Sequence, residues 1–122
     1  MRASTRTLLA LAAVLLAAAC GGGQTVREPT GSFSVTLDDY LIRPQQIRVP
    51  KRVPLTVTVL NRGRLGHTFR IRSANHTVLK LSTIAPGGRA SRTFKLAPGR
   101  YTMFCALANH EELGMSGTLV VG

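Results

Sequence analysis

Hydrophobic and polar residues alternate over most of residues 32–122, as they do in β-strands with one buried face. The clearest run is LTVTVL at residues 55–60, which is rich in β-branched side chains. Only residues 106–113 suggest a helical turn. The pattern predicts an all-β domain, a Greek-key β-sandwich of seven or eight strands. The strand segments are residues 33–37, 55–60, 67–71, 78–84, 90–96, 100–105 and 117–121, with two short pieces at 41–42 and 47–49 around Pro44.

The first 31 residues lack this alternation. Residues 8–19 form an unbroken apolar run behind two arginines, which is too short to span a membrane comfortably and is typical of a signal peptide. The run ends at Cys20 in the sequence LAAAC, which resembles a bacterial lipobox; an ordinary secretory signal is the alternative. We expect a signal peptide at residues 1–19, then lipidated Cys20 and a flexible tether over residues 20–31. The domain of residues 32–122 would then be held on the extracytoplasmic side of the membrane.

The chain is strongly basic, with a formal net charge of +11. Removal of the signal peptide, with Arg2 and Arg6, leaves +9. Export argues against nucleic acid as the partner. The basic residues are spread along the sequence from Arg27 to Arg100, which favours a solvated basic surface near anionic headgroups over one that steers an acidic redox partner.

Four side chains in this domain are candidate metal ligands. Cys105, His110 and Met115 follow one another at intervals of five residues near the end of the chain, and His67 lies in an upstream strand-like segment. Cys105 has no disulfide partner if Cys20 is lipidated. One thiolate, two imidazoles and a thioether are the ligands of a type 1 copper site, whereas zinc rarely recruits a thioether. We therefore predict one copper ion.

The sequence PGRYTMFCALANHEELGMSGTLVV at residues 98–121 resembles the copper loop of cupredoxins of the plastocyanin/azurin superfamily. Its spacing is closest to that of rusticyanin- and sulfocyanin-like members, and GHTF at residues 66–69 resembles their upstream ligand strand. The resemblance implies that His67, Cys105 and His110 are strong ligands and that Met115 is axial. It also implies surrounding roles for Thr68, by a hydrogen bond, for Phe104, and for the carbonyl of Gly66 as a weak fifth contact.

The sequence indicates an electron carrier rather than an enzyme. Phe104 and Ala106 flank Cys105, where multicopper oxidases place histidines, and the chain has three histidines in all. No Ser-His-Asp pattern is present, and we interpret Asp38 and Asp39 as a solvated strand end. Two alternatives stay open: a lipoprotein that binds or delivers copper, and a metal-free interaction module.

The resemblance also implies where electrons pass. They would enter and leave through the edge of His110, within an apolar patch that we assign to Leu107, Ala108 and Leu113. A c-type cytochrome or a terminal oxidase is the expected partner, and the protein is expected to be a monomer. Glu111 and Glu112 beside this patch either are solvated or orient a basic partner.

Overall fold

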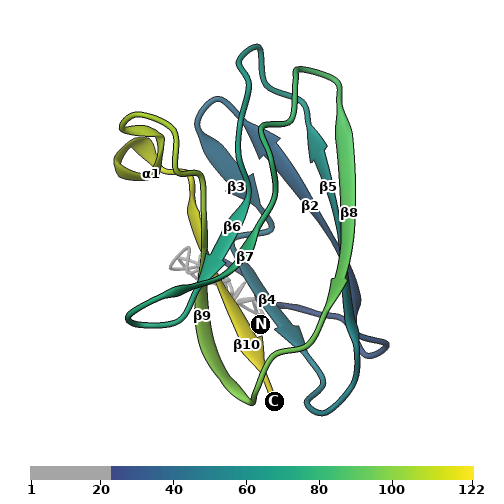
Figure 1. Ribbon diagram of the computed structural model, residues 1–122. Coiled ribbons are helices and arrows are strands. Elements are labelled where there is room, and N and C mark those ends of the chain that lie inside the picture. Colours follow the sequence, from purple (N-terminus) through teal and green to yellow (C-terminus); the bar gives the residue numbers. More distant parts are fainter. Residues whose placement is uncertain (1–22) are drawn as a thin grey trace, which may run out of the picture.

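The computed structural model describes residues 23–122, which form a sandwich of two β-sheets (Figure 1). The predicted all-β sandwich is confirmed. No helix in this part of the chain is long and apolar enough to cross a membrane. The six-stranded sheet has the order β1 (Val26–Arg27), β4 (Gln46–Val49), β10 (Ser116–Val121), β9 (Gly99–Phe104), β6 (Arg70–Arg72) and β7 (Thr77–Lys80). The four-stranded sheet has the order β3 (Leu41–Arg43), β2 (Ser32–Asp38), β5 (Leu55–Asn61) and β8 (Arg89–Phe94).

The alternation of the sequence places one face of each central strand in the core. In β5, Leu55, Val57 and Val59 are fully buried while the intervening residues are partly exposed. β2 pairs with β5 in parallel and shows the same alternation. The facing sheet contributes buried side chains such as Met103 and Leu119. The core side chains and both sheets come from residues 26–121, so the chain from residue 23 onward contains a complete sandwich and folds as a unit.

Residues 20–31 are not all tether. Val26 and Arg27 pair in parallel with Ile47 and Arg48, and form the short edge strand β1. The backbone N–H of Glu28 also donates to the carbonyl of Arg48 at 2.9 Å. The open edge of β4 provides these hydrogen-bonding groups, which composition alone does not reveal. Cys20 and the predicted signal peptide lie outside the described residues.

The strand count also differs from the prediction of seven or eight. Ten strands are present between residues 23 and 122, because Pro44 separates β3 from β4, which join different sheets, and because β1 adds an edge. The predicted strand at residues 67–71 starts only at Arg70. His67 instead makes an isolated bridge with Ile84, through N–H···O bonds of 3.1 and 2.8 Å. The predicted helical turn is realised as α1 (His110–Leu113).

The topology brings several chain segments to one end of the sandwich. The parallel strands β2 and β5 both finish there, β9 ends there at Phe104, and the antiparallel pairing of Phe104 with Ser116 closes residues 105–115 into a loop. In Figure 1 this is the upper end, which carries α1. We call it the metal end, since all four candidate ligands lie there or next to it.

Asn61 ties the loops of the metal end together. Its side chain is fully buried, although the sequence places it in a turn. Its Nδ2 donates to the carbonyls of Leu65 and Ile84 at 2.8 Å each, and its Oδ1 accepts the N–H of Gly63 at 2.8 Å. One amide therefore satisfies three backbone groups on two loops.

We expect Asn61→Ala to lower the free energy of unfolding by about 2–4 kcal/mol, because it removes three hydrogen bonds and leaves the carbonyl of Leu65 and the N–H of Gly63 without these partners. Denaturant unfolding of the metal-free protein measures the change. The control is Asn75→Ala, at an exposed turn position, which should cost less than about 0.5 kcal/mol. Equal losses in the two variants would show that Asn61 does not organise this end.

Candidate metal centre

Three of the candidate ligands lie on the loop between β9 and β10. Cys105 directly follows β9, and its N–H donates to the carbonyl of Met115 at 3.2 Å. The N–H of Met115 donates in turn to the carbonyl of His110 at 3.0 Å. These two bonds fix the backbone at all three positions. Cys105 is 1% exposed and Met115 is fully buried.

The donor atoms of His67, Cys105 and His110 converge in the interior. All lie within 4.8 Å of one another, and all three residues are buried. Sγ of Cys105 is 3.6 Å from Nδ1 of His110 and 4.0 Å from Nδ1 of His67, and the two Nδ1 atoms are 3.3 Å apart. Ligands at about 2.0–2.3 Å from a shared ion in a trigonal plane would be about 3.5–3.8 Å apart. The spacing fits one metal ion.

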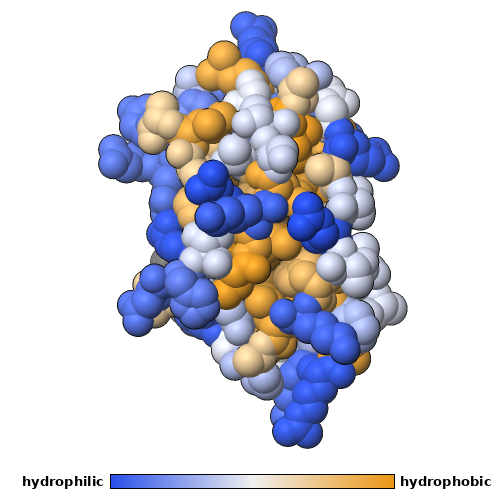
Figure 2. All heavy atoms as spheres, viewed as in Figure 1, coloured by the Kyte–Doolittle hydropathy of each residue, from blue (hydrophilic) through white to orange (hydrophobic). Residues whose placement is uncertain are grey.

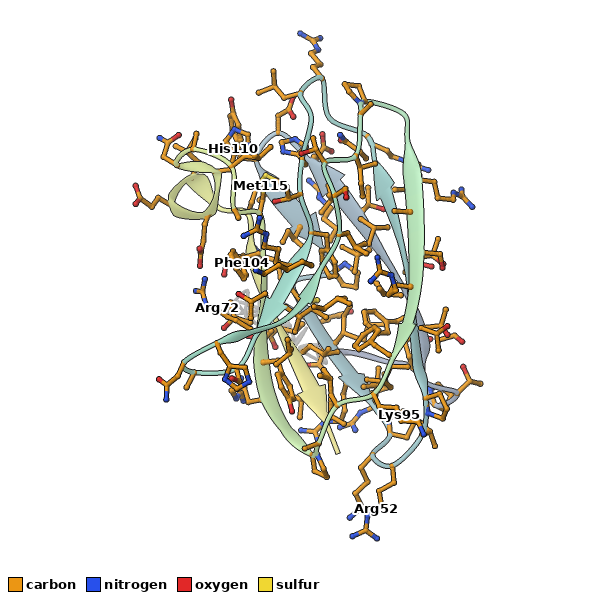
Figure 3. The ribbon with its side chains drawn as sticks, viewed as in Figure 1. Arg52, Arg72, Lys95, Phe104, His110 and Met115 are labelled. Atoms are coloured by element: carbon orange, nitrogen blue, oxygen red, sulfur yellow. The ribbon has the colours of Figure 1, made fainter. Side chains whose placement is uncertain are left out.

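Met115 supplies a soft fourth side chain beside this trio. Figure 3 shows Met115 and His110 together at the metal end. A thioether next to a thiolate and two imidazoles selects copper over zinc, which favours further thiolate or imidazole donors. The residues therefore fit a type 1 copper site, made of His67, Cys105, His110 and Met115.

Thr68 holds the sulfur of Cys105. Its Oγ1 donates to Sγ at 3.6 Å and accepts the N–H of Ala106 at 2.9 Å. Thr68 is 4% exposed, so water does not compete strongly for the hydroxyl. A hydrogen bond to a thiolate draws electron density from the sulfur and fixes its position. The contact expected of Thr68 is therefore present, while a weak contact from the carbonyl of Gly66 stays a prediction.

Asp39 contacts the second ring nitrogen of His67. The Nε2–H of His67 donates to Oδ1 of Asp39 at 2.6 Å, and the N–H of Arg64 donates to Oδ2 at 2.8 Å. The N–H of Arg64, and then the imidazole of His67, hold the pKa of Asp39 below its usual 3.8. With the proton on Nε2, the Nδ1 lone pair faces the other donors, as in carboxylate–histidine–metal triads. Asp39 is exposed after the end of a strand, as interpreted, but the sequence analysis missed its contact with His67, which lies 28 residues further along the chain.

Gly63 makes room for this contact. A Cβ built on Gly63 would lie 2.8 Å from Nε2 of His67 and would overlap the carboxylate of Asp39. Any other residue would push the two partners apart. The close approach, rather than a turn, requires glycine here.

Arg72 fastens the ligand loop to the sheet. Its guanidinium stacks over the ring of Phe104 at 4.3 Å and makes two hydrogen bonds to Glu111, one of them 3.0 Å long. Figure 3 shows Arg72 and Phe104 together below α1. Glu111 follows the ligand His110, so this pair ties α1 to β6. The carboxylate of Glu111 is thus engaged within the protein, whereas Glu112 is exposed.

The surface around His110 is partly apolar. His110 is 9% exposed, and its ring packs against Tyr40 with centroids 4.9 Å apart. Of the predicted patch, Leu113 is 52% exposed and Ala108 is exposed, but Leu107 is half-buried against the core. Sequence reasoning missed Leu65, which is 43% exposed. Ala108 has φ +43°, in the left-handed region that favours glycine.

Comparisons with known proteins agree with this fold. The sequence model of the Cupredoxin-like domain family matches residues 7–121. The structure resembles reduced auracyanin from the photosynthetic bacterium Roseiflexus castenholzii, with a TM-score of 0.70, 18% identity, and coverage of 78% of this chain and 99% of that one. It also resembles rusticyanin from Thiobacillus ferrooxidans, with a TM-score of 0.68, 19% identity, and coverage of 84% of each chain. At these identities the likeness concerns the fold. No curated protein sequence matches the chain significantly.

Replacement of Asp39 tests its contact with His67. We expect Asp39→Asn to weaken copper binding by about tenfold or more, because the ligand loses its oriented, electron-rich partner. The reduction potential should rise, since a negative charge near the metal favours Cu(II). In the metal-free protein, the Nε2 proton of His67 should exchange faster in nuclear magnetic resonance spectra.

Asp38→Asn is the matched control, since it removes the same charge one residue away. The N–H of Asp39 donates to Oδ1 of Asp38 at 3.2 Å, and no contact between Asp38 and His67 is seen in the described chain. Equal changes in copper affinity and proton exchange for the two variants would contradict a direct role of Asp39.

Proposed function

Because the chain belongs to the family of cupredoxin-like domains, we propose that it is a type 1 blue-copper electron carrier. The observation that carries the proposal is the convergence of Sγ of Cys105 with Nδ1 of His67 and His110 in a buried site, beside Met115. Copper bound there would take up and release one electron as it cycles between Cu(II) and Cu(I).

The chain's own residues favour transfer with little rearrangement. Cys105 and His110 are fixed by backbone hydrogen bonds, and His67 by its bridge to Ile84. Thr68 orients the thiolate of Cys105, and Asp39 orients the imidazole of His67, each through a hydrogen bond. A site held this firmly keeps one geometry for both oxidation states, so the barrier from reorganisation is small.

The edge of His110 is the proposed route for electrons. It is the ligand with the largest exposed fraction, 9%, against 0–1% for the other three. Leu113, Ala108 and Leu65 are exposed at the same end of the molecule. Such apolar side chains would let a partner dock closely and exclude water from the path. A c-type cytochrome or a terminal oxidase is the proposed partner of a monomeric carrier.

A second catalytic metal centre finds no support between residues 23 and 122. A single group of three or more His, Cys, Asp and Glu donors is close enough there to hold a metal ion, and it is the one already described. A carrier needs one redox centre, whereas a copper oxidase needs a further one to activate its substrate. This favours electron transfer over catalysis.

Anchoring through Cys20 completes the proposal. The lipobox-like sequence precedes the described residues, and a lipidated Cys20 would hold the carrier on the extracytoplasmic face of the membrane. Attachment to the membrane would keep it near membrane-bound redox partners.

Copper delivery is the alternative, and it predicts an exchangeable metal. The ligands of a delivery protein would be accessible to the protein that receives the copper. Here the sulfur ligands Cys105 and Met115 are at most 1% exposed. A metal-free interaction module, in turn, gives no reason for three buried donors to converge.

Repeated redox cycling in the presence of a Cu(I) chelator separates these functions. We expect ascorbate to bleach the blue band and ferricyanide to restore it over many cycles, with little copper passing to bathocuproine disulfonate. A His76→Ala variant, which lacks the exposed histidine outside the site, should give the same trace. Rapid loss of copper to the chelator in the Cu(I) state would favour delivery instead.

A further inference from the structure

The acidic residues gather at the metal end of the folded chain. Asp38 ends β2, Asp39 contacts His67, and Glu111 and Glu112 lie on α1. These are four of the five acidic residues in the whole sequence. The remaining one, Glu28, lies beside β4 toward the other end.

A separate group of basic residues lies at the opposite end. The pairing of Leu55 with Phe94 brings the loop before β5 next to the loop after β8. Lys51, Arg52 and Lys95 on these loops are all exposed. Figure 3 shows Arg52 and Lys95 together at the bottom of the sandwich, far from His110 and Met115.

Three arginines continue this charge on the outer face of the six-stranded sheet. Cross-strand pairing aligns Arg27 with Arg48, Arg48 with Val120, and Val120 with Arg100. Arg48, Arg100 and Val120 point outward, because neighbours such as Ile47, Tyr101 and Leu119 are buried, and Arg27 is exposed. We call these arginines, with Lys51, Arg52 and Lys95, the basic pole.

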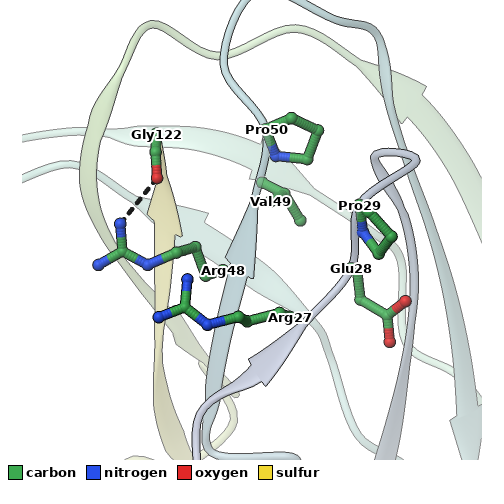
Figure 4. Close-up of a pocket in the computed structure, with 7 residues that line it drawn as sticks. All are labelled: Arg27, Glu28, Pro29, Arg48, Val49, Pro50 and Gly122. Atoms are coloured by element: carbon green, nitrogen blue, oxygen red, sulfur yellow. Dashed lines mark hydrogen bonds between the residues drawn. The ribbon is translucent and has the colours of Figure 1, made fainter.

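In the described chain, no salt bridge joins a side chain of the basic pole to an acidic side chain. Arg27 and Arg48 lie directly opposite each other on adjacent strands, a like-charge arrangement that is unfavourable without a counter-ion. Arg48 donates to the main-chain oxygen of Gly122 at 2.7 Å. Figure 4 shows the two guanidinium groups side by side over a shallow hollow, with the carboxylate of Glu28 pointing away from them. The pole therefore offers free positive charge to an external polyanion.

We propose that the basic pole binds anionic phospholipid headgroups and directs the metal end away from the membrane. We choose phospholipid as the partner because the tether precedes the basic pole in the sequence. This choice rests on the proposed lipidation of Cys20. Cys20 lies six residues before Val26, and six extended residues span at most about 20 Å. Gly23 and Gln24 lie beside Leu41–Gln45, and Arg27 follows in β1, so an anchor at Cys20 keeps the arginine row within reach of the bilayer surface.

Charge at the two ends gives the orientation. At the metal end, basic residues such as Arg64, Arg72 and Arg89 offset the four acidic ones. An anionic surface therefore attracts the basic pole more strongly than the metal end, which sets the sandwich upright. His110 then faces away from the bilayer, open to a partner. An acidic redox protein bound at the basic pole would instead be separated from His110 by the whole length of the sandwich.

Binding of the metal-free domain of residues 23–122 to vesicles tests the proposal. We expect it to sediment with vesicles of equal parts phosphatidylglycerol and phosphatidylcholine, but not with pure phosphatidylcholine, and to be released by salt. Lys51→Glu/Arg52→Glu/Lys95→Glu should weaken binding by 100-fold or more, at about fivefold for each cation lost near the surface. Because the assay needs neither copper nor lipidation, its outcome is independent of the proposed electron transfer.

The matched control is Arg62→Glu/Lys80→Glu/Arg89→Glu, which makes the same change of net charge at exposed positions away from the basic pole. It should weaken vesicle binding much less. Equal losses of vesicle binding in the two variants would show that binding depends on net charge alone, and would overturn the proposal that the basic pole is a defined binding site. No vesicle binding, together with pole-dependent binding to polyglutamate, would overturn the membrane assignment in favour of an acidic protein.

Discussion

Three polar metal donors, His67, Cys105 and His110, are buried at one end of a small sandwich, and their burial constrains everything around them. An imidazole or a thiolate without a partner in the interior costs several kcal/mol, on the order of 2–7 for a polar group. Here Asp39 accepts the proton of His67, and Thr68 donates to the sulfur of Cys105. The donors face one another at 3.3–4.0 Å, in a geometry that suits one copper ion.

Much of this arrangement could be predicted from local sequence. Alternation located β2 and β5, and the spacing of Cys105, His110 and Met115 located a ligand loop after a strand. Both signals are local. In a strand, successive side chains point to opposite faces, so the direction of each follows from its place in the sequence. The hydrogen-bonding role of Thr68 was expected from a family resemblance, and its contact with the sulfur of Cys105 is present.

What could not be predicted depends on contacts between distant segments. Asp39 looks like a solvated strand end, and Asn61 like a turn residue, until the parallel pairing of β2 with β5 places both beside the ligand loops. Gly63 is needed only because that contact is close. The basic pole is the same kind of feature, because its members are scattered over residues 27–100 and only the registers of the two sheets bring them together.

Visible and electron paramagnetic resonance spectra of residues 23–122 with one equivalent of Cu(II) test the central claim most directly. We predict an intense blue or green thiolate-to-copper band with narrow copper hyperfine splitting, both absent in Cys105→Ala. A colourless protein, or a tetragonal copper spectrum that Cys105→Ala leaves unchanged, would contradict a type 1 site and with it the electron carrier.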